Sequence, residues 1–140
     1  MSEFRKARML KNMALKEQAR MPQFIQRQNL LSEEIAQLEA LLARIGVLRE
    51  EAGGEEVRAA HRLQSNRWYE LQLIEQEQTL RAKLDFLEIE LADVRKALRR
   101  MSHKKQRVTE KAEDALRLAR LEREAVLERA QVMPLRMPRS

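Results

Sequence analysis

Two series of apolar residues recur at alternating steps of three and four positions, and the pair Gly53-Gly54 stands between them. The first series is Met21, Phe24, Leu31, Ile35, Leu38, Leu42 and Ile45, and the second is Leu80, Leu84, Leu87, Leu91, Val94, Leu98 and Met101. Residues at this spacing share one face of an α-helix, and a face that stays apolar over several heptads is buried against a partner helix. The two series therefore predict an all-α fold, a long antiparallel two-helix coiled-coil hairpin.

The composition is that of long helices. Of the 140 residues, 36% are charged and 4% are aromatic, with only three glycines and three prolines, which leaves little material for a β-sheet. The absence of cysteine excludes disulfides and thiolate metal sites. No signal peptide is recognisable, and no uncharged run reaches the roughly 18 residues of a membrane span, so we expect a cytoplasmic protein.

Helix start and stop signals divide the chain further. We expect the hairpin to cover 1–132, with helix one over about 2–52, a short helical or loop tip over 53–65, helix two over about 66–132, and a flexible C-terminal tail over 133–140. Ser2 and the Ser65-Asn66 pair are candidate N-caps, and Pro134 forbids regular continuation of helix two. Pro22 lies inside helix one and predicts a kink near Ala19, although the heptad phase on both sides of it favours one bent helix.

Two charged residues interrupt the predicted seam and indicate its register. Setting Leu31 opposite Leu91 also places Glu17 opposite Lys105, so that the two misplaced charges face each other. A slip of one heptad would press each charge against apolar surface without a partner, which is costly. The first register is therefore preferred.

The net charge of +6 and the isoelectric point near 10.1 would suit an acidic partner, an anionic lipid surface or nucleic acid. In the predicted hairpin, cations from both helices gather at the end that carries the two termini. The candidate partner-binding collar there consists of Arg5, Lys6, Arg8, Arg99, Arg100, Lys104, Lys105 and Arg107. The alternative interpretation of this surface is the ordinary solvated flank of a coiled coil.

We find no catalytic motif, no nucleotide-binding loop and no set of residues with metal-ligand spacing, which predicts a protein that is not an enzyme and has no cofactor. The residues best suited to recognition are Trp68 and Tyr69, the only Trp and Tyr in the chain. They either plug the splayed tip of the hairpin, the interpretation that we favour, or anchor a partner.

Two short stretches resemble a known family. Ser65-Asn66-Arg67-Trp68 resembles the start of the second helix in FliJ, the flagellar type III export protein, and in its injectisome counterparts of the YscO kind, and Lys104-Lys105-Gln106-Arg107 is similar to a basic run of that family. The resemblance implies an antiparallel coiled-coil stalk at the inner-membrane export apparatus. The end of the stalk that carries both termini would enter a hexameric type III export ATPase, and the tip side would face the export gate protein. The stalk would also help to escort export chaperones.

The resemblance also implies a gate-facing surface on helix two. On the tip side this surface would comprise Arg67, Trp68, Tyr69 and Ile74. At Gln78, Arg81 and Asp85 the more apolar pattern of the family is not kept. The membrane would then be approached only indirectly, through the export apparatus.

Three other functions remain open from the residues alone. A basic helical hairpin could bind nucleic acid, although the aromatics needed for stacking lie at the end away from the predicted collar. The second alternative is a plain coiled-coil scaffold, which includes a dimer in which the two series pair between chains. The third is a membrane-surface role for the first helix, whose apolar stripe is interrupted by Lys11 and Glu17.

Overall fold

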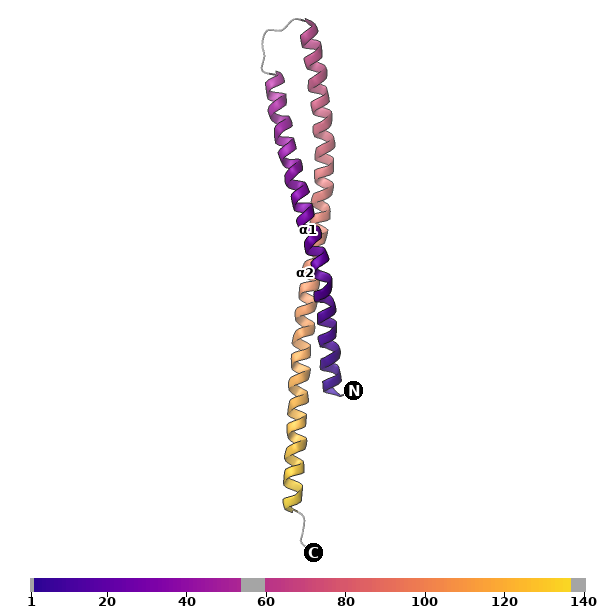
Figure 1. Cartoon of the computed structure of the whole chain (residues 1–140), viewed down its shortest axis with the longest axis vertical. Coiled ribbons are helices and arrows are strands. Elements are labelled where there is room, and N and C mark those ends of the chain that lie inside the picture. Colours follow the sequence, from indigo (N-terminus) through magenta and orange to yellow (C-terminus); the bar gives the residue numbers. More distant parts are fainter. Residues whose placement is uncertain (1, 54–59, 137–140) are drawn as a thin grey trace. The chain divides into compact units, whose positions relative to one another are not determined.

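The computed structural model describes residues 2–53 and 60–136 and contains two helices, α1 (Glu3–Gly53) and α2 (Ala60–Arg136) (Figure 1). Among these residues only Ser2 lies outside a helix, and no strand occurs. The two helices pack against each other as an all-α helical hairpin, which confirms the predicted fold class. Neither helix, over the residues described, carries an apolar stretch long enough to cross a bilayer.

The first helix begins where the sequence predicts. The backbone N–H of Arg5 donates to Ser2 Oγ at 3.3 Å, and that of Lys6 donates to the Ser2 carbonyl at 3.1 Å, so Ser2 caps the helix. Glu3 places a carboxylate in the first turn, at the positive end of the helix dipole. The helix then passes through Pro22 without ending, which confirms one helix rather than two.

The chain divides into two compact units, each made of one segment of α1 and one of α2. Unit 1 comprises Met1–Gln23 and Leu98–Ser140, and unit 2 comprises Phe24–Ala97. In α1 the division falls between Gln23 and Phe24, one residue beyond Pro22. Each unit has its own cluster of buried residues, and each is described separately below.

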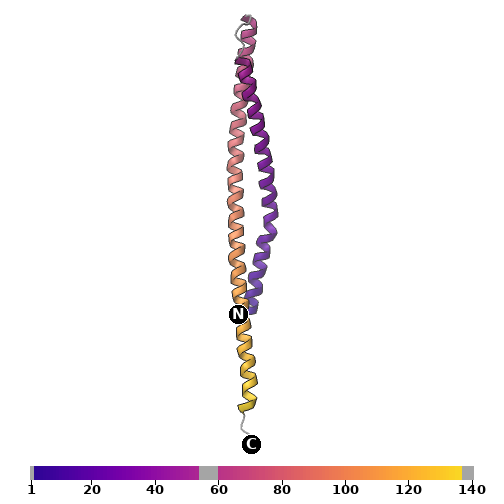
Figure 2. The ribbon, with the colours of Figure 1, turned by 90° about the vertical axis from the view of Figure 1, so that its left-hand side faces the viewer.

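The core of unit 2 consists of large aliphatic side chains. Its buried residues are Leu31, Leu38, Leu87 and Leu91, with Ile35, Leu80, Leu84 and Val94 packed around them. Two ion pairs join the helices, Arg27 to Glu90 at 2.9 Å and Arg49 to Glu77 at 2.6 Å. Because the residue number rises along α1 while it falls along α2, the two segments run antiparallel, and they can be followed side by side in Figure 2.

The core of unit 1 is built from smaller side chains. Its buried members are Ala7, Leu10, Ala14, Val108 and Ala115, with Ala112 and Leu116 packed against them. Alanine buries far less apolar surface than leucine, so each heptad of this seam contributes less to stability than a heptad of unit 2.

The observed clusters agree with the predicted register, but the partner of Glu17 differs. Leu31 and Leu91 share one cluster, as predicted. The carboxylate of Glu17 lies 2.9 Å from Nζ of Lys104, not of Lys105. Lys104 is placed beside the seam, so its aliphatic stem can lie along the helix while its ammonium group, on a half-exposed side chain, stays in water.

Both predicted boundaries of the second helix were wrong. α2 begins at Ala60, six residues before the expected start at residue 66, so Ser65 and Asn66 lie inside the helix and do not cap it. It ends at Arg136, so Met133 to Arg136 of the expected tail are helical in spite of Pro134. Serine and asparagine cost only about 0.5 kcal/mol in a helix interior. Pro134 removes one backbone hydrogen bond and its ring crowds the preceding turn, but only two helical residues follow it. The rest of the expected tip (54–59) and of the tail (137–140) lies outside the described residues.

Candidate protein-binding surfaces

The two units carry opposite charge. By sequence, unit 1 holds 18 Lys and Arg against 8 Asp and Glu, whereas unit 2 holds 10 against 14. The net charge of +6 therefore understates how basic unit 1 is. A helical pair with this excess of cations presents positive potential that favours an acidic surface.

All eight residues of the predicted collar belong to unit 1. Seven of them are exposed, namely Arg5, Lys6, Arg8, Arg99, Arg100, Lys104 and Arg107, and Lys105 is half-buried. They do not form a single ring. Arg8 lines a hollow together with Glu113 of α2, whereas Lys104 lies beside Glu17, nine residues further along α1. At a rise of about 1.5 Å per residue, these two levels are separated by about 13 Å.

The predicted collar set leaves out two cations of the same basic end that lie at the level of Lys104. Lys16 and Arg20 flank Glu17 on α1, and both side chains are exposed. Nη1 of Arg20 lies 3.8 Å from the carboxylate of Glu17. Both residues lie within one turn of Glu17, so the Glu17–Lys104 ion pair sets their level.

Glu17 gives Lys104 a structural role. The Glu17 side chain is 8% exposed, and its Oε1 accepts the contacts from both Lys104 and Arg20. A carboxylate buried to this extent needs a cation close by. Of the predicted collar residues, Lys104 is therefore the one whose charge is already used inside unit 1.

Unit 2 contains a second polar pair in its seam that the sequence interpretation did not single out. Oε2 of Glu77 accepts a hydrogen bond from Nη1 of Arg49 at 2.6 Å, and Oε1 lies 2.8 Å from Arg81. The hydrogen bond from Arg49 holds the pKa of the Glu77 carboxyl below its ordinary value; partial desolvation opposes this, and the charges of Arg49 and Arg81 add to it. Both residues continue the heptad series, Arg49 after Ile45 and Glu77 before Leu80, so their opposite charge at seam positions was a usable signal.

The start of α2 presents an exposed aromatic side chain. Trp68 is 65% exposed and Leu71, three residues on, is 58% exposed, so the preferred interpretation of Trp68 as a packed plug was wrong. Leu73, five residues after Trp68, faces the seam and is 4% exposed. Five residues do not make a whole number of helical turns, at about 3.6 residues per turn, so Trp68 points away from the seam. Tyr69 is 41% exposed, and Ile74 is half-buried.

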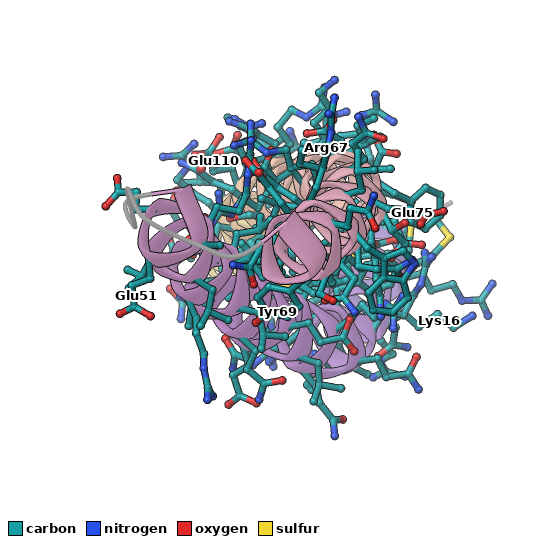
Figure 3. The ribbon with its side chains drawn as sticks, turned by 90° about the horizontal axis from the view of Figure 1, so that it is seen from above. Lys16, Glu51, Arg67, Tyr69, Glu75 and Glu110 are labelled. Carbon is teal, nitrogen blue, oxygen red and sulfur yellow. The ribbon has the colours of Figure 1, made fainter. Side chains whose placement is uncertain are left out.

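The four predicted tip-side residues do not share one face. Viewed along the helices, Arg67 and Tyr69 project from opposite sides of α2 (Figure 3). Trp68 lines a shallow hollow with Gln64, Ser65, Asn66 and Tyr69. The surface that could anchor a partner is therefore Trp68 with Leu71, a residue that the prediction left out, while Arg67 lies beside it.

Within residues 2–53 and 60–136, no three His, Cys, Asp or Glu side chains lie close enough together to hold a metal ion. The candidate binding surfaces are the basic surface of unit 1, the exposed Trp68 and Leu71, and the grooves beside the seam of unit 1. No protein-family model, curated protein or solved structure matches the chain.

Proposed function

We propose that this protein is a non-enzymatic coiled-coil stalk of a type III protein export ATPase complex, similar to FliJ or YscO proteins. The observation that carries the proposal is the charge difference between the units, with 18 cations against 8 acids in unit 1. A helical pair of this kind can bind an acidic socket in an ATPase ring and bias which subunit conformations are occupied, without a nucleotide site of its own.

The export gate protein is the second proposed partner, and Trp68 is the proposed anchor. Tryptophan is enriched among the residues that dominate binding energy at interfaces, and the exposed Leu71 extends the apolar surface beside Trp68. Ile74 contributes less to this contact than its sequence position implied, because its side chain is half-buried. Escort of export chaperones, and a place at the inner-membrane export apparatus, belong to the same proposal.

Binding to a type III export ATPase, and stimulation of its hydrolysis, test the proposal. The informative variant is Arg99→Glu/Arg100→Glu/Arg107→Glu, which reverses three exposed cations of unit 1 and leaves the Glu17–Lys104 pair intact. Lys83→Glu/Arg95→Glu/Lys96→Glu is the matched control, because it makes the same charge change at exposed positions of unit 2. We expect the first variant to bind at least about tenfold more weakly and the control to bind like the wild type.

Two results would contradict the stalk proposal. One is equal loss of ATPase binding in both triple variants, since the site would then not be the basic surface of unit 1. The other is binding of random duplex DNA more tightly than the ATPase at physiological salt, with a steep loss as salt rises, which would favour the nucleic-acid alternative. Circular dichroism of each variant confirms that its helices are retained.

A further inference from the structure

The alanine seam of unit 1 leaves an open groove between the two helices. Its floor is formed by Ala7 and Ala14 of α1 and by Ala112 of α2, and its volume is about 530 Å³. Leucines at these positions would fill the space, as the leucines of the unit 2 cluster do. The groove exists because the seam residues are small, and a third set of side chains could pack on this floor.

Large apolar side chains line the same groove. Phe4 of α1 is 44% exposed, and Leu116 of α2 is half-buried against the alanine cluster. Phe4 also lines a neighbouring hollow with Val126 and Leu127 of α2, both exposed. Apolar surface therefore continues along α2 beyond the groove, although the chain supplies no helix to cover it within the residues described.

The two rims of the groove carry opposite charge. Arg8 and Lys11 stand on the α1 side and Glu113 stands on the α2 side. All three side chains are exposed, and none of them forms an ion pair within the part of the chain that the structure describes. A ligand in the groove would meet two cations along one edge and one carboxylate along the other.

This combination selects one class of ligand. A bilayer requires a convex apolar face, and this surface is a concave groove between two helices. Phosphates of a nucleic acid would meet Glu113 on the second rim, and the only aromatic ring in the groove is Phe4. An amphipathic helix fits, because its apolar face can pack on the alanines while the charges on its flanks meet the rims.

We propose that this groove binds an amphipathic helix of a partner protein, with acidic side chains on the flank that faces Arg8 and Lys11. The bound helix completes a local three-helix bundle. Because the rims differ in sign, the helix has a preferred direction: reversal would place its acidic flank against Glu113. From Phe4 to Ala14 the groove extends about 15 Å, which corresponds to about three helical turns of contact. The proposal does not depend on an export ATPase.

Fluorescence titration with a labelled synthetic helix tests the proposal on the full chain. The probe is a peptide of about 18 residues, long enough to be helical, with leucines along one face and glutamates along one flank. The first control peptide has lysine in place of each glutamate, and the second has the composition of the probe in scrambled order. At about 0.15 M salt, where the Debye length is about 8 Å, we expect the acidic helix to bind at least about tenfold more tightly than either control.

Two charge-reversed proteins locate the contact. Arg8→Glu/Lys11→Glu should weaken the acidic helix at least about tenfold and should improve binding of the lysine helix. Arg99→Glu/Arg100→Glu makes the same charge change on unit 1 at least nine residues, about 13 Å, along α2 from the groove lining; because this exceeds the Debye length, it should change both affinities by less than about twofold. Thr109→Trp fills the groove from its rim without altering charge and should also weaken the acidic helix.

The proposal fails if the acidic helix binds no more tightly than the scrambled peptide. It also fails if the two charge-reversed proteins lose affinity equally, since the effect would then come from the general field of unit 1. Because no ATPase takes part in these titrations, their failure leaves the stalk proposal standing, and loss of ATPase binding leaves the groove standing. Circular dichroism shows which variants have kept their helices and can be compared.

Discussion

Nζ of Lys104 lies 2.9 Å from Oε1 of Glu17, whose residue is only 6% exposed although it occupies a seam position of unit 1. The lysine approaches from beside the seam and remains half-exposed. The ion pair therefore links α1 to α2 inside unit 1, one turn from the buried Met101. Such a pair specifies register more than it adds stability, because burying the carboxylate has its own cost.

Removing Lys104 alone should lower the free energy of unfolding more than removing the charges of both Lys104 and Glu17. Lys104→Met leaves the Glu17 carboxylate buried without its nearest cation, and we expect the free energy of unfolding to fall by about 1–3 kcal/mol, with solvent at the half-exposed lysine favouring the lower end. Glu17→Leu/Lys104→Met should recover most of this loss, since an apolar seam replaces the buried charge. Urea unfolding followed by circular dichroism measures both.

Lys105→Met is the matched control for this prediction. Lys105 is half-buried and occupies the position first expected to face Glu17, but the ion pair is made by Lys104. We expect Lys105→Met to change the free energy of unfolding less than Lys104→Met does. A larger loss in Lys105→Met would mean that the assignment of the Glu17 partner is wrong.

The Arg49–Glu77 pair predicts a pH dependence of stability. The pKa of Glu77 is lower in the folded protein, chiefly because of the hydrogen bond from Arg49. The stabilisation is therefore fully present above the pKa that the carboxyl has in the unfolded chain, and it is lost as the pH falls through the folded-state pKa. Between pH 7 and acidic pH, the urea midpoint of the wild type should fall more than that of Glu77→Gln. Parallel pH profiles would contradict this role.

The heptad pattern was sufficient to predict the fold. The four buried leucines of the unit 2 cluster all belong to the two predicted apolar series. The charged seam residues selected the register, because the preferred alignment placed Glu17 opposite Lys105, one residue from its observed partner Lys104. Small or weakly apolar seam residues of α2 were missed. Val108, Ala115 and Ala119 are buried, but valine and alanine are common on any helix face and give little contrast in a sequence.

The helix boundaries and the surfaces were less accessible to sequence reasoning. Ser65 and Asn66 satisfy the composition of an N-cap, yet the energetic difference between a cap and a helix interior is small enough for neighbouring turns to decide. Likewise, the exposure of Trp68 depends on which residues at the start of α2 face the seam, and the structure places Leu73 there. The groove follows from alanines on both helices meeting at one level, which a linear pattern shows only after the register is known.

Gly46 offers a stabilising substitution. It lies inside α1 on an exposed turn, and a Cβ added there would meet no other atom within 4 Å. Because glycine loses more backbone freedom than alanine when a helix forms, Gly46→Ala should raise the free energy of unfolding by about 0.5–1 kcal/mol. Ala43→Gly, at an exposed position one turn earlier, should lower it by a similar amount. Unchanged stability in both variants would indicate that this part of α1 frays before the hairpin unfolds.

Trp68 and Leu73 lie five residues apart on α2 and should respond oppositely in assays of stability and binding. Trp68→Ala removes a side chain that is 65% exposed, so the free energy of unfolding should change by no more than about 0.5 kcal/mol. Leu73→Ala opens a cavity at a side chain that is 4% exposed and should cost about 2–5 kcal/mol. If Trp68 anchors the export gate protein, Trp68→Ala should weaken binding to the gate's cytoplasmic domain at least about tenfold while the thermal unfolding curve stays in place. A strongly destabilised Trp68→Ala protein would instead restore the interpretation of Trp68 as a packing residue and would remove it from the proposed interface.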